Sequence, residues 1–509
     1  MIGLILIIII CALWAWSRFN RNKNEPPSIP GGLPLIGHAH RLIGDKLWKS
    51  VVELSYDSLR LGGVLSAAIG PRTIYVLTDP EDALTVANTC LQKDAFYEFA
   101  KCWLGEGLVT GKLSIWRHHR RLLNPAFSQV VLDSFLGVFN SQSRRLVDDL
   151  KKEVGKGPFD HWVYTRITYT LPLIYSYEEL LRIDPQYVKA TEQIFNVFVE
   201  RFQKFWLHND YIYQWSGLRK KQDSLLEILH NMSYTVNYLK RLETGQVEEK
   251  TGNLVKFAYF SSYITNQVLS KVRFGVETSE RALRMTPPCQ VGVLAIGESH
   301  SGAFNDREIQ EHVDTMIVGG HDTSASVLMF TLLLIGSHPH VQDKIVEELK
   351  DVFGGEDRDV TKQDLSQLVY LEAVIKESMR IYPIVPVTAR VLDRDLKLKR
   401  YTLSKGRTCF MFVYGIHRHP MWGEDREEFK PERWLDPATL PECPTAFAAF
   451  NMGRRICIGK SYAYMSMKTT LAHLMRQYKV KGDHTKLILK IDVMLKPEAG
   501  HHISIEKRS

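Results

Sequence analysis

The residues with the clearest chemical pattern surround Cys457, near the C-terminal end of the chain. Residues 450–459 read FNMGRRICIG and fit the pattern F-x-x-G-x-R-x-C-x-G. Gly453 and Gly459 lie on either side of the cysteine and let the chain curl closely enough for backbone N–H groups to approach the sulfur. A thiolate in such a loop can bind the iron of a haem, and Arg455 can neutralise a haem propionate. The alternative is a small buried cysteine in a glycine-rich turn.

A second pattern lies within the apolar run from Asp314 to Ile335, where the chain reads Gly-Gly-His-Asp-Thr from Gly319. Glycine in a helix interior costs about 1 kcal/mol relative to alanine, so two in succession need a reason. A small ligand held beside the helix would be such a reason. Asp322 and Thr323 form an acid–alcohol pair that can relay protons to that ligand. The alternative is a helix that ends at the glycines, followed by an Asp-Thr cap of a new helix.

Two further pairs are spaced for one helix face. Trp116 and Arg120 are four residues apart in the sequence WRHHR. Their indole N–H and guanidinium can bind a propionate, although a solvated basic helix face has the same appearance. Glu377 and Arg380 are three apart and can form an ion pair, which alone is weak evidence because such pairs are abundant on solvated faces.

In their order along the chain, these motifs resemble those of the cytochrome P450 family. The resemblance covers about residues 26–505. It implies a mainly α fold with small β-sheets, in which helices form a triangular prism, a long central helix crosses the distal face of haem b, and the cysteine loop lies on the proximal face. The haem is expected to be held non-covalently apart from the Cys457 thiolate, which is the axial ligand of the iron.

The resemblance also assigns roles to individual residues. The catalytic residues are Gly320, Asp322 and Thr323. Glu377 and Arg380, with Arg433 of the sequence PERW, form a buried structural triad behind the haem. The other residues expected to bind the cofactor are Trp116, Arg120, Arg390, Phe450, Gly453, Arg455 and Gly459.

Four segments are most similar to the branch of the family that includes the fatty-acid omega-hydroxylases. They read WRHHRRLLNPAF, GGHDTSAS, GIHRHP and FNMGRRICIG. Many members of that branch have glutamate just before the Gly-His-Asp-Thr run, and this carboxylate can become ester-linked to the haem. This chain has Gly319 there, so we expect no covalent attachment, and the resemblance does not extend to terminal-carbon regioselectivity.

The N-terminal segment is uncharged and apolar, and it predicts a membrane anchor helix over residues 1–19. Arg18, Arg21 and Lys23 follow the apolar run, which favours an uncleaved anchor with the catalytic part in the cytosol. The alternative is a cleaved signal peptide. Residues 20–40 form a basic and proline-rich connector, and the expected location is the cytosolic face of the endoplasmic reticulum membrane.

Composition limits the rest of the chain. The 509 residues are 45% hydrophobic and 24% charged, which is typical of a globular protein, and we expect one catalytic domain over residues 41–509. Seven scattered cysteines predict neither a disulfide framework nor a zinc site. The 65 basic residues are nearly matched by 57 acidic ones, which argues against nucleic-acid binding and favours an acidic protein partner or an anionic membrane.

Local patterns predict several elements. Residues 64–68 and 73–77 are predicted to form the two strands of a hairpin. Asp79-Pro80 predicts the start of a helix, and from there to about residue 385 the pattern of apolar residues is mostly helical. A helix over 462–474 would turn its positive end toward Cys457. Strands are expected over 487–495 and 501–505, on either side of a turn at 497–500.

The expected activity is that of a haem-thiolate monooxygenase, which inserts one oxygen atom of O2 into a C–H bond of a fatty acid-like or other small hydrophobic substrate. No flavin or nicotinamide module is apparent, so electrons from NADPH must arrive through NADPH-cytochrome P450 reductase, with cytochrome b5 as a further partner. Two alternatives remain open: a haem-thiolate isomerase or dehydratase acting on lipid hydroperoxides, and a non-catalytic haem- or ligand-binding protein.

Overall fold

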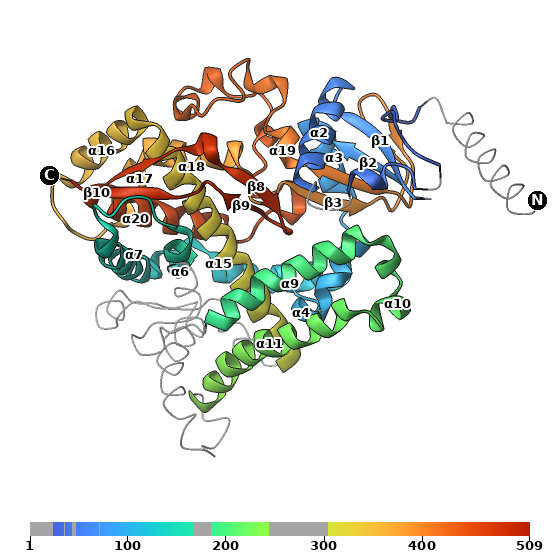
Figure 1. Cartoon of the computed structure of the whole chain (residues 1–509), viewed down its shortest axis with the longest axis horizontal. Helices are drawn as coiled ribbons and strands as arrows, with labels where there is room; N and C mark the ends of the chain where they lie inside the picture. Colours follow the sequence, from blue (N-terminus) through green and yellow to red (C-terminus); the bar gives the residue numbers. More distant parts are fainter. Residues whose placement is uncertain are drawn as a thin grey trace, which may run out of the picture.

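The computed structural model describes residues 24–34, 36–42, 47–70, 72–166, 168, 185–243 and 304–508. The expected anchor at residues 1–19 lies outside these ranges. Figure 1 shows helices making up most of the molecule, with the N-terminal strands toward the right of the view and the C-terminal strands running from the left side to the centre. The mainly α fold with small sheets is therefore confirmed.

The helices bear out the helical periodicity of the central part of the chain. Their bounds are α2 Leu47–Arg60, α3 Pro80–Thr89, α4 Lys101–Leu104, α5 Leu113–Leu123, α6 Gln129–Ser134, α7 Leu136–Leu150, α9 Pro185–Gln203, α10 Asp210–Gln214, α11 Gly217–Glu243, α15 Asp306–Ser337, α16 Pro339–Phe353, α17 Lys362–Gln367, α18 Val369–Ile381, α19 Val413–Ile416 and α20 Lys460–Gln477. The predicted start of α3 is confirmed, because the Asp79 side chain accepts hydrogen bonds from the backbone N–H groups of Glu81 and Asp82.

One four-stranded sheet and three two-stranded sheets complete the fold. The larger sheet has the order β1-β2-β6-β3, and the pairs are β7 with β10, β4 with β5 and β8 with β9. The strand bounds are β1 Val64–Ile69, β2 Arg72–Leu77, β3 Val387–Val391, β4 Leu396–Lys397, β5 Thr402–Leu403, β6 Thr408–Phe412, β7 Tyr478–Gly482, β8 Ile488–Ile491, β9 Leu495–Ala499 and β10 Ile503–Lys507.

The predicted N-terminal hairpin is confirmed by β1 and β2, which pair antiparallel from Val64 opposite Leu77 to Ile69 opposite Arg72. The strands expected over 487–495 and 501–505 are found in part, as β8 and β10, but the turn expected at 497–500 was wrong. The chain turns at residues 492–494, so that β8 pairs with β9, while β10 pairs with β7, a strand that the prediction missed. Pro497 was taken for a turn residue but lies within β9, where its missing N–H is tolerated because a two-stranded sheet has only edge strands.

Helix α15 crosses the middle of the molecule, and Figure 1 shows it between α9 and α11 on one side and α18 and α20 on the other. A capping box formed by Asn305 and Glu308 begins the helix, which continues through Gly319 and Gly320 without a break. The alternative of two helices separated at the glycines is therefore wrong. Among the described residues, α15 is the one helix long and apolar enough to cross a membrane, but most of it is buried in the core.

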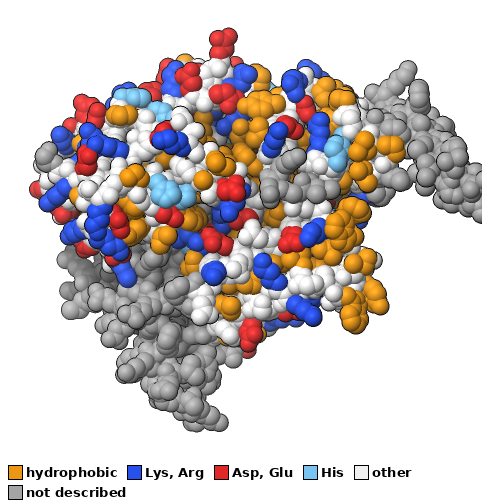
Figure 2. Space-filling model, viewed as in Figure 1, with side chains coloured by type: hydrophobic (Ala, Val, Ile, Leu, Met, Phe, Trp, Pro, Cys, Tyr) orange, Lys and Arg blue, Asp and Glu red, His pale blue; other side chains and the backbone are white. Residues whose placement is uncertain are grey.

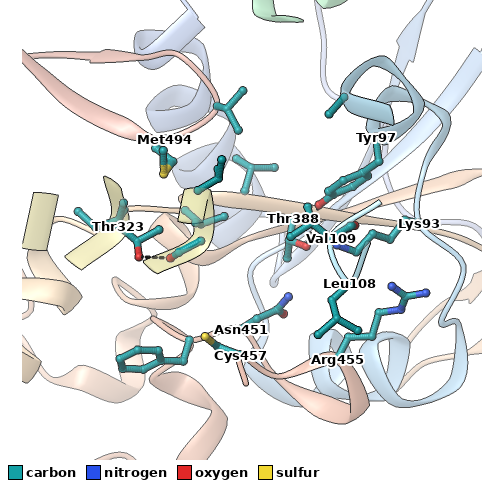
Figure 3. Close-up of a pocket in the computed structure, with 18 of the residues that line it drawn as sticks. Lys93, Tyr97, Leu108, Val109, Thr323, Thr388, Asn451, Arg455, Cys457 and Met494 are labelled. Atoms are coloured by element: carbon teal, nitrogen blue, oxygen red, sulfur yellow. Dashed lines mark hydrogen bonds between the residues drawn. The ribbon is translucent and has the colours of Figure 1, made fainter. Parts of the chain in front are cut away.

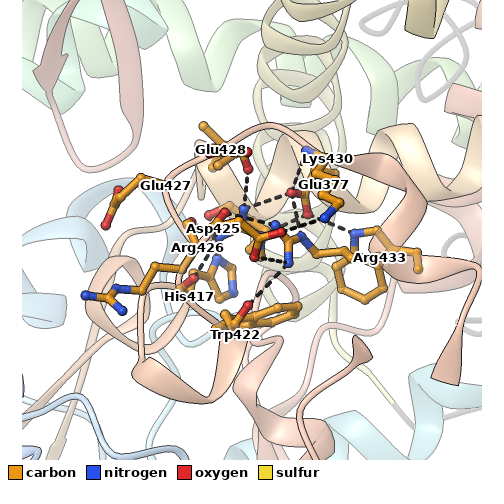
Figure 4. Close-up of polar contacts among 12 residues, drawn as sticks. Glu377, His417, Trp422, Asp425, Arg426, Glu427, Glu428, Lys430 and Arg433 are labelled. Carbon is orange, nitrogen blue, oxygen red and sulfur yellow. Dashed lines mark hydrogen bonds and ion pairs between the residues drawn. The ribbon is translucent and has the colours of Figure 1, made fainter. Parts of the chain in front are cut away.

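A buried ionic cluster joins α18 to the loop that precedes the cysteine segment (Figure 4). The Arg380 guanidinium donates to both carboxylate oxygens of Glu377 at 2.9 and 2.8 Å, and Arg433 donates to Glu377 Oε1 at 2.9 Å. All three side chains are buried, and Trp434 donates a further bond to Glu377 Oε2. The remaining N–H groups of Arg380 donate to backbone carbonyls, including those of His417 and Glu428, whereas Arg433 also donates to the Asp425 carboxylate at 3.2 Å.

Replacing Glu377 with glutamine is expected to lower the free energy of unfolding by about 3–5 kcal/mol, because buried Arg380 loses its carboxylate partner and Arg433 keeps only Asp425. The measurement is the thermal unfolding midpoint of the purified protein. Glu347→Gln, on the exposed face of α16, is the control and should unfold at the wild-type temperature. Equal midpoints for both variants would show that the cluster does not stabilise the fold.

Candidate active site

Most of the residues predicted to act on or bind a cofactor line one cavity of about 610 Å³, a volume typical of small-molecule sites; Asp322, Arg390 and Gly453 do not line it. Its lining is mostly apolar and includes Cys457 on one side and Gly319, Gly320 and Thr323 of α15 on the other. Figure 3 shows the Cys457 sulfur and the Thr323 hydroxyl facing the same space, with Arg455 off to one side. Segments more than a hundred residues apart in the sequence thus form one site.

The cysteine loop owes its shape to two residues with left-handed backbone angles. Asn451 has φ 64° and Gly453 has φ 65°. At Gly453 an added Cβ would lie 2.8 Å from Asn88 Oδ1 and 3.0 Å from the Ala87 carbonyl carbon, so the position excludes a side chain. The Cys457 N–H then donates to the Phe450 carbonyl at 3.0 Å, which closes the loop.

The sulfur lies just before the N-terminal end of α20, as the sequence predicted. Gly459 is the N-cap of this helix. Burial raises the pKa of the Cys457 thiol, while a hydrogen bond from the Gly459 backbone and the positive charges of Arg120 and Lys460 act in the opposite direction. The protein therefore offers the thiolate three stabilising groups, and a metal ion at the sulfur would supply the rest.

Arg120 reaches the cysteine loop from α5, four residues after Trp116. Its Nη1 donates to the Ile456 carbonyl at 2.9 Å, and its Nε donates to Asn124 Oδ1 at 2.8 Å. The side chain also lines the cavity. Arg120 thus holds the backbone next to the sulfur in place, and its guanidinium places a positive charge in the wall of the cavity.

Two buried arginines leave polar atoms without a partner. The Arg455 guanidinium lies over the Trp116 ring at 4.3 Å, and its Nε and Nη1 have no hydrogen-bond acceptor among the described residues. Arg390 is fully buried, and its Nε and Nη2 are likewise without an acceptor in the described part of the chain. Burial lowers the pKa of both, that of Arg455 to about 9. Such donors cost stability unless an anion binds them.

The sequence interpretation missed Lys93, which belongs to the same group of cations. The Lys93 side chain lines the cavity and donates to the Val109 carbonyl at 2.5 Å. Burial and the charges of Arg390 and Arg455 hold its pKa well below the usual range. A lone lysine between two loops carries no motif, so only the fold reveals it. The basic side chains of Lys93, Arg120 and Arg455 and the Trp116 indole line the same apolar cavity as the Cys457 thiol, with Arg390 buried nearby. This arrangement fits a flat apolar group that bears carboxylates.

On the distal side, the structure separates the two members of the predicted acid–alcohol pair. Thr323 lines the cavity, and its hydroxyl donates to the Gly319 carbonyl at 2.7 Å. The Asp322 side chain is fully buried and does not line the cavity, because its carboxylate turns toward Lys496 Nζ at 2.8 Å. An added Cβ at Gly319 meets nothing within 4 Å, so the cavity is open where many members of the branch have glutamate.

Comparison with known proteins identifies the family. The model of the family described as Cytochrome P450 matches residues 26–503. The chain belongs to the cytochrome P450 family. It is 30% identical over 516 residues to cytochrome P450 4V2 of Mus musculus, covering 99% of this chain and 94% of that protein. It is 28% identical over 531 residues to cytochrome P450 4c3 of Drosophila melanogaster, covering 100% of this chain and 94% of that protein.

The family assignment confirms several expectations. This cytochrome P450 is a haem-thiolate monooxygenase, its cofactor is haem held by a cysteine thiolate, and its relatives belong to family 4, the branch that its motifs resemble. The cavity fits that cofactor on its own evidence. The thiol in its wall, its apolar lining and the N–H groups of Arg390 and Arg455 that have no acceptor among the described residues match the sulfur ligand, macrocycle and propionates of haem.

A pair of glycine substitutions tests whether backbone geometry builds the site. Gly453→Ala should lose at least about tenfold in haem content, because its Cβ meets the backbone at Ala87 and its φ is strained. Gly319→Ala, which meets nothing, should retain haem and stabilise α15 by up to about 1 kcal/mol. The measurement is haem bound per purified protein, with thermal unfolding as a check. Full haem content in Gly453→Ala would contradict the proposed loop geometry.

Proposed function

We propose that this cytochrome P450 inserts one oxygen atom from O2 into a C–H bond of a fatty acid-like or other small hydrophobic substrate, with Cys457 as the thiolate ligand. One observation carries the proposal: Cys457 and the Gly319–Thr323 stretch of α15 face each other across a single, largely apolar cavity. A long apolar molecule gains about 25 cal/mol for each Å² of its surface that leaves water, so such walls favour lipids over polar compounds.

The haem contacts follow from the placement of charge. Cys457 would ligate the iron, and Trp116, Arg120, Arg390 and Arg455 would bind the propionates, with Lys93 as an addition that the sequence did not suggest. Gly453 and Gly459 shape the proximal loop. The family resemblance also assigns Phe450, the first residue of this loop, to the haem-binding residues. Its ring centroid lies 5.2 Å from that of Tyr464.

When bound, the thiolate-ligated haem supplies the activation of dioxygen and the transfer of one oxygen atom to carbon. The protein's own residues do the rest. Gly320 has no side chain and leaves room in the cavity beside α15, and the Thr323 hydroxyl is positioned to pass a proton into the cavity. Asp322 lies one residue away in a buried ion pair and would have to leave Lys496 to supply that proton.

Electron supply requires a partner, which we propose to be NADPH-cytochrome P450 reductase, with cytochrome b5 as a further donor. Exposed basic side chains lie close to the cysteine loop, namely Arg117, Arg121, Arg454 and Lys460. A positive surface of this kind steers an acidic protein toward the proximal side. The dependence of turnover on ionic strength follows from the same charges.

A membrane location is supported by a cluster of exposed aromatic residues at one end of α9. Phe205, Trp206, Tyr211 and Trp215 are 53%, 48%, 72% and 79% exposed. Figure 2 shows hydrophobic side chains gathered over this end of the molecule. Tryptophan and tyrosine favour the membrane–water interface. We propose that residues 1–19 anchor the protein in the endoplasmic reticulum membrane. The connector at residues 20–40 would join this anchor to the single catalytic domain on the cytosolic face, and the aromatic cluster would add a second contact with the membrane.

Reconstitution with reductase separates the proposal from its alternatives. With lauric acid as the probe, the purified protein should consume NADPH and O2 and form a hydroxylated product. An isomerase or dehydratase would instead convert a lipid hydroperoxide without NADPH, and a binding protein would do neither. NADPH-independent conversion, or ligand binding without oxygen uptake, would overturn the proposal.

The Thr323 hydroxyl offers a second test in the same assay. Thr323→Ala should reduce product formed per NADPH by about tenfold or more, because a positioned proton donor is lost. Thr323→Ser keeps the hydroxyl and should retain most of the coupling. Equal coupling in the wild type and both variants would remove Thr323 from the proton route.

A further inference from the structure

The carboxylate of Asp322 is held by the tail of the chain. Its closest cation is Lys496 Nζ, 2.8 Å from Oδ2, on strand β9. Arg166 Nε lies farther away, 3.9 Å from Oδ1, and that guanidinium already donates to Glu192 at 2.7 Å. Lys496 is therefore the main charge partner of Asp322, and both side chains are almost completely removed from solvent.

The strand that carries Lys496 belongs to a hairpin whose tip lies in the cavity. The turn between β8 and β9 comprises Asp492, Val493 and Met494, and the last two of these line the cavity. Figure 3 shows the Met494 side chain on the same side of the cavity as Thr323. Met494 ends the turn and Lys496 is the second residue of β9, two positions later, so a displacement of the tip also moves the ammonium group.

Two features make this hairpin able to shift. Val493 has φ 91°, and a β-branched residue in the left-handed region stores about 1–3 kcal/mol of strain that another turn conformation can release. Lys496 is also shared between two carboxylates, because Asp492 Oδ2 lies 3.5 Å from its Nζ. One ammonium group thus contacts two buried carboxylates, and it can move toward either without losing its charge compensation.

We propose that Lys496 is a positioning residue for Asp322, and that a substrate pressing on Val493 and Met494 moves the β8–β9 hairpin and so sets how firmly the Asp322 carboxylate is held. The inference rests on the proposed monooxygenase function, in which Asp322 supplies protons to the Thr323 side of the cavity. Without substrate, Lys496 holds Asp322 ionised and turned from the cavity. With substrate, Lys496 moves toward Asp492 and Asp322 is free to carry a proton.

The charges around the hairpin agree with this arrangement. Burial, with a contribution from Asp322, raises the pKa of Asp492 to about 6, while Lys496 and Lys490 lower it and Glu192 raises it. For Asp322, burial raises the pKa but Lys496, His321 and Arg166 together hold it below its ordinary value. Asp492 is therefore the carboxylate that gains or loses a proton near neutral pH, and its ionised form competes for Lys496.

Two substitutions with opposite expected signs test the proposal in the holoenzyme with reductase and lauric acid. Lys496→Met removes the cation, so Asp322 should bind protons on the order of tenfold more tightly and the midpoint of the pH–rate profile should rise by about one unit. Asp492→Asn removes the competing carboxylate, so the midpoint should fall. Lys479→Met, which removes an exposed lysine from β7, should leave the profile unchanged, and Lys496→Arg should restore most of the wild-type profile.

Hydrogen exchange of the backbone amides at residues 491–496 gives a readout that does not depend on turnover. Asp322→Asn should speed this exchange, and lauric acid should change it in the wild type but less in the variant. If Lys496→Met does not fold, two other variants replace it, because each buries fewer charges than the wild type. They are Asp492→Asn and the double variant Asp322→Asn with Lys496→Met. Unchanged pH profiles together with unchanged exchange in Asp322→Asn would overturn the inference. Absence of NADPH-dependent turnover in the wild type would overturn the proposed function, and the exchange data alone would then decide whether Lys496 holds the hairpin to α15.

Discussion

The exposure of one thiol to a deep apolar cavity is the constraint on which the rest of the site depends. Cys457 can face that cavity because the chain folds back on itself between Phe450 and Cys457, where one backbone hydrogen bond closes the loop. The left-handed conformation of Gly453 permits that turn within contact distance of α3. Helix α20 begins directly after the loop and packs against α15, which crosses the opposite wall, so packed helices hold the loop at a set distance from α15.

The buried arginines divide into two groups by how fully their N–H groups are satisfied. Arg380 and Arg433 meet Glu377 and several backbone carbonyls, which makes their cluster a self-contained part of the fold. Arg390 and Arg455 have buried donors with no acceptor among the described residues. Because an unpaired buried donor costs about 1–3 kcal/mol, the second group stabilises the protein only when an anion is bound. The same residue type thus supports the fold in one place and a cofactor in the other.

Much of this organisation was predictable from local sequence. The hairpin at 64–77, the start of α3 and the long distal helix follow from alternation, an Asp-Pro cap and an apolar run, each of which acts over a few residues. The turn in the tail was misplaced because the turn at 492–494 contains aspartate, valine and methionine and no glycine or proline, whereas Pro497 suggested a turn where β9 continues.

Residues whose role depends on distant partners could not be predicted from local pattern. Lys93 and Lys496 belong to no motif, and each gains its meaning only from groups that the fold brings beside it. Asp322 carries a motif, yet its neighbours in sequence gave no sign that its carboxylate would turn away from the cavity. Buried charge pairs of this kind are set by tertiary packing, which a single sequence does not report.

The most direct test of the account is the absorption spectrum of the reduced protein with carbon monoxide, recorded beside that of Cys457→Ser. The account predicts the strongly red-shifted Soret band of a thiolate-ligated haem in the wild type and its loss in the variant. A variant that keeps the same band would show that Cys457 is not the ligand and would contradict the central assignment.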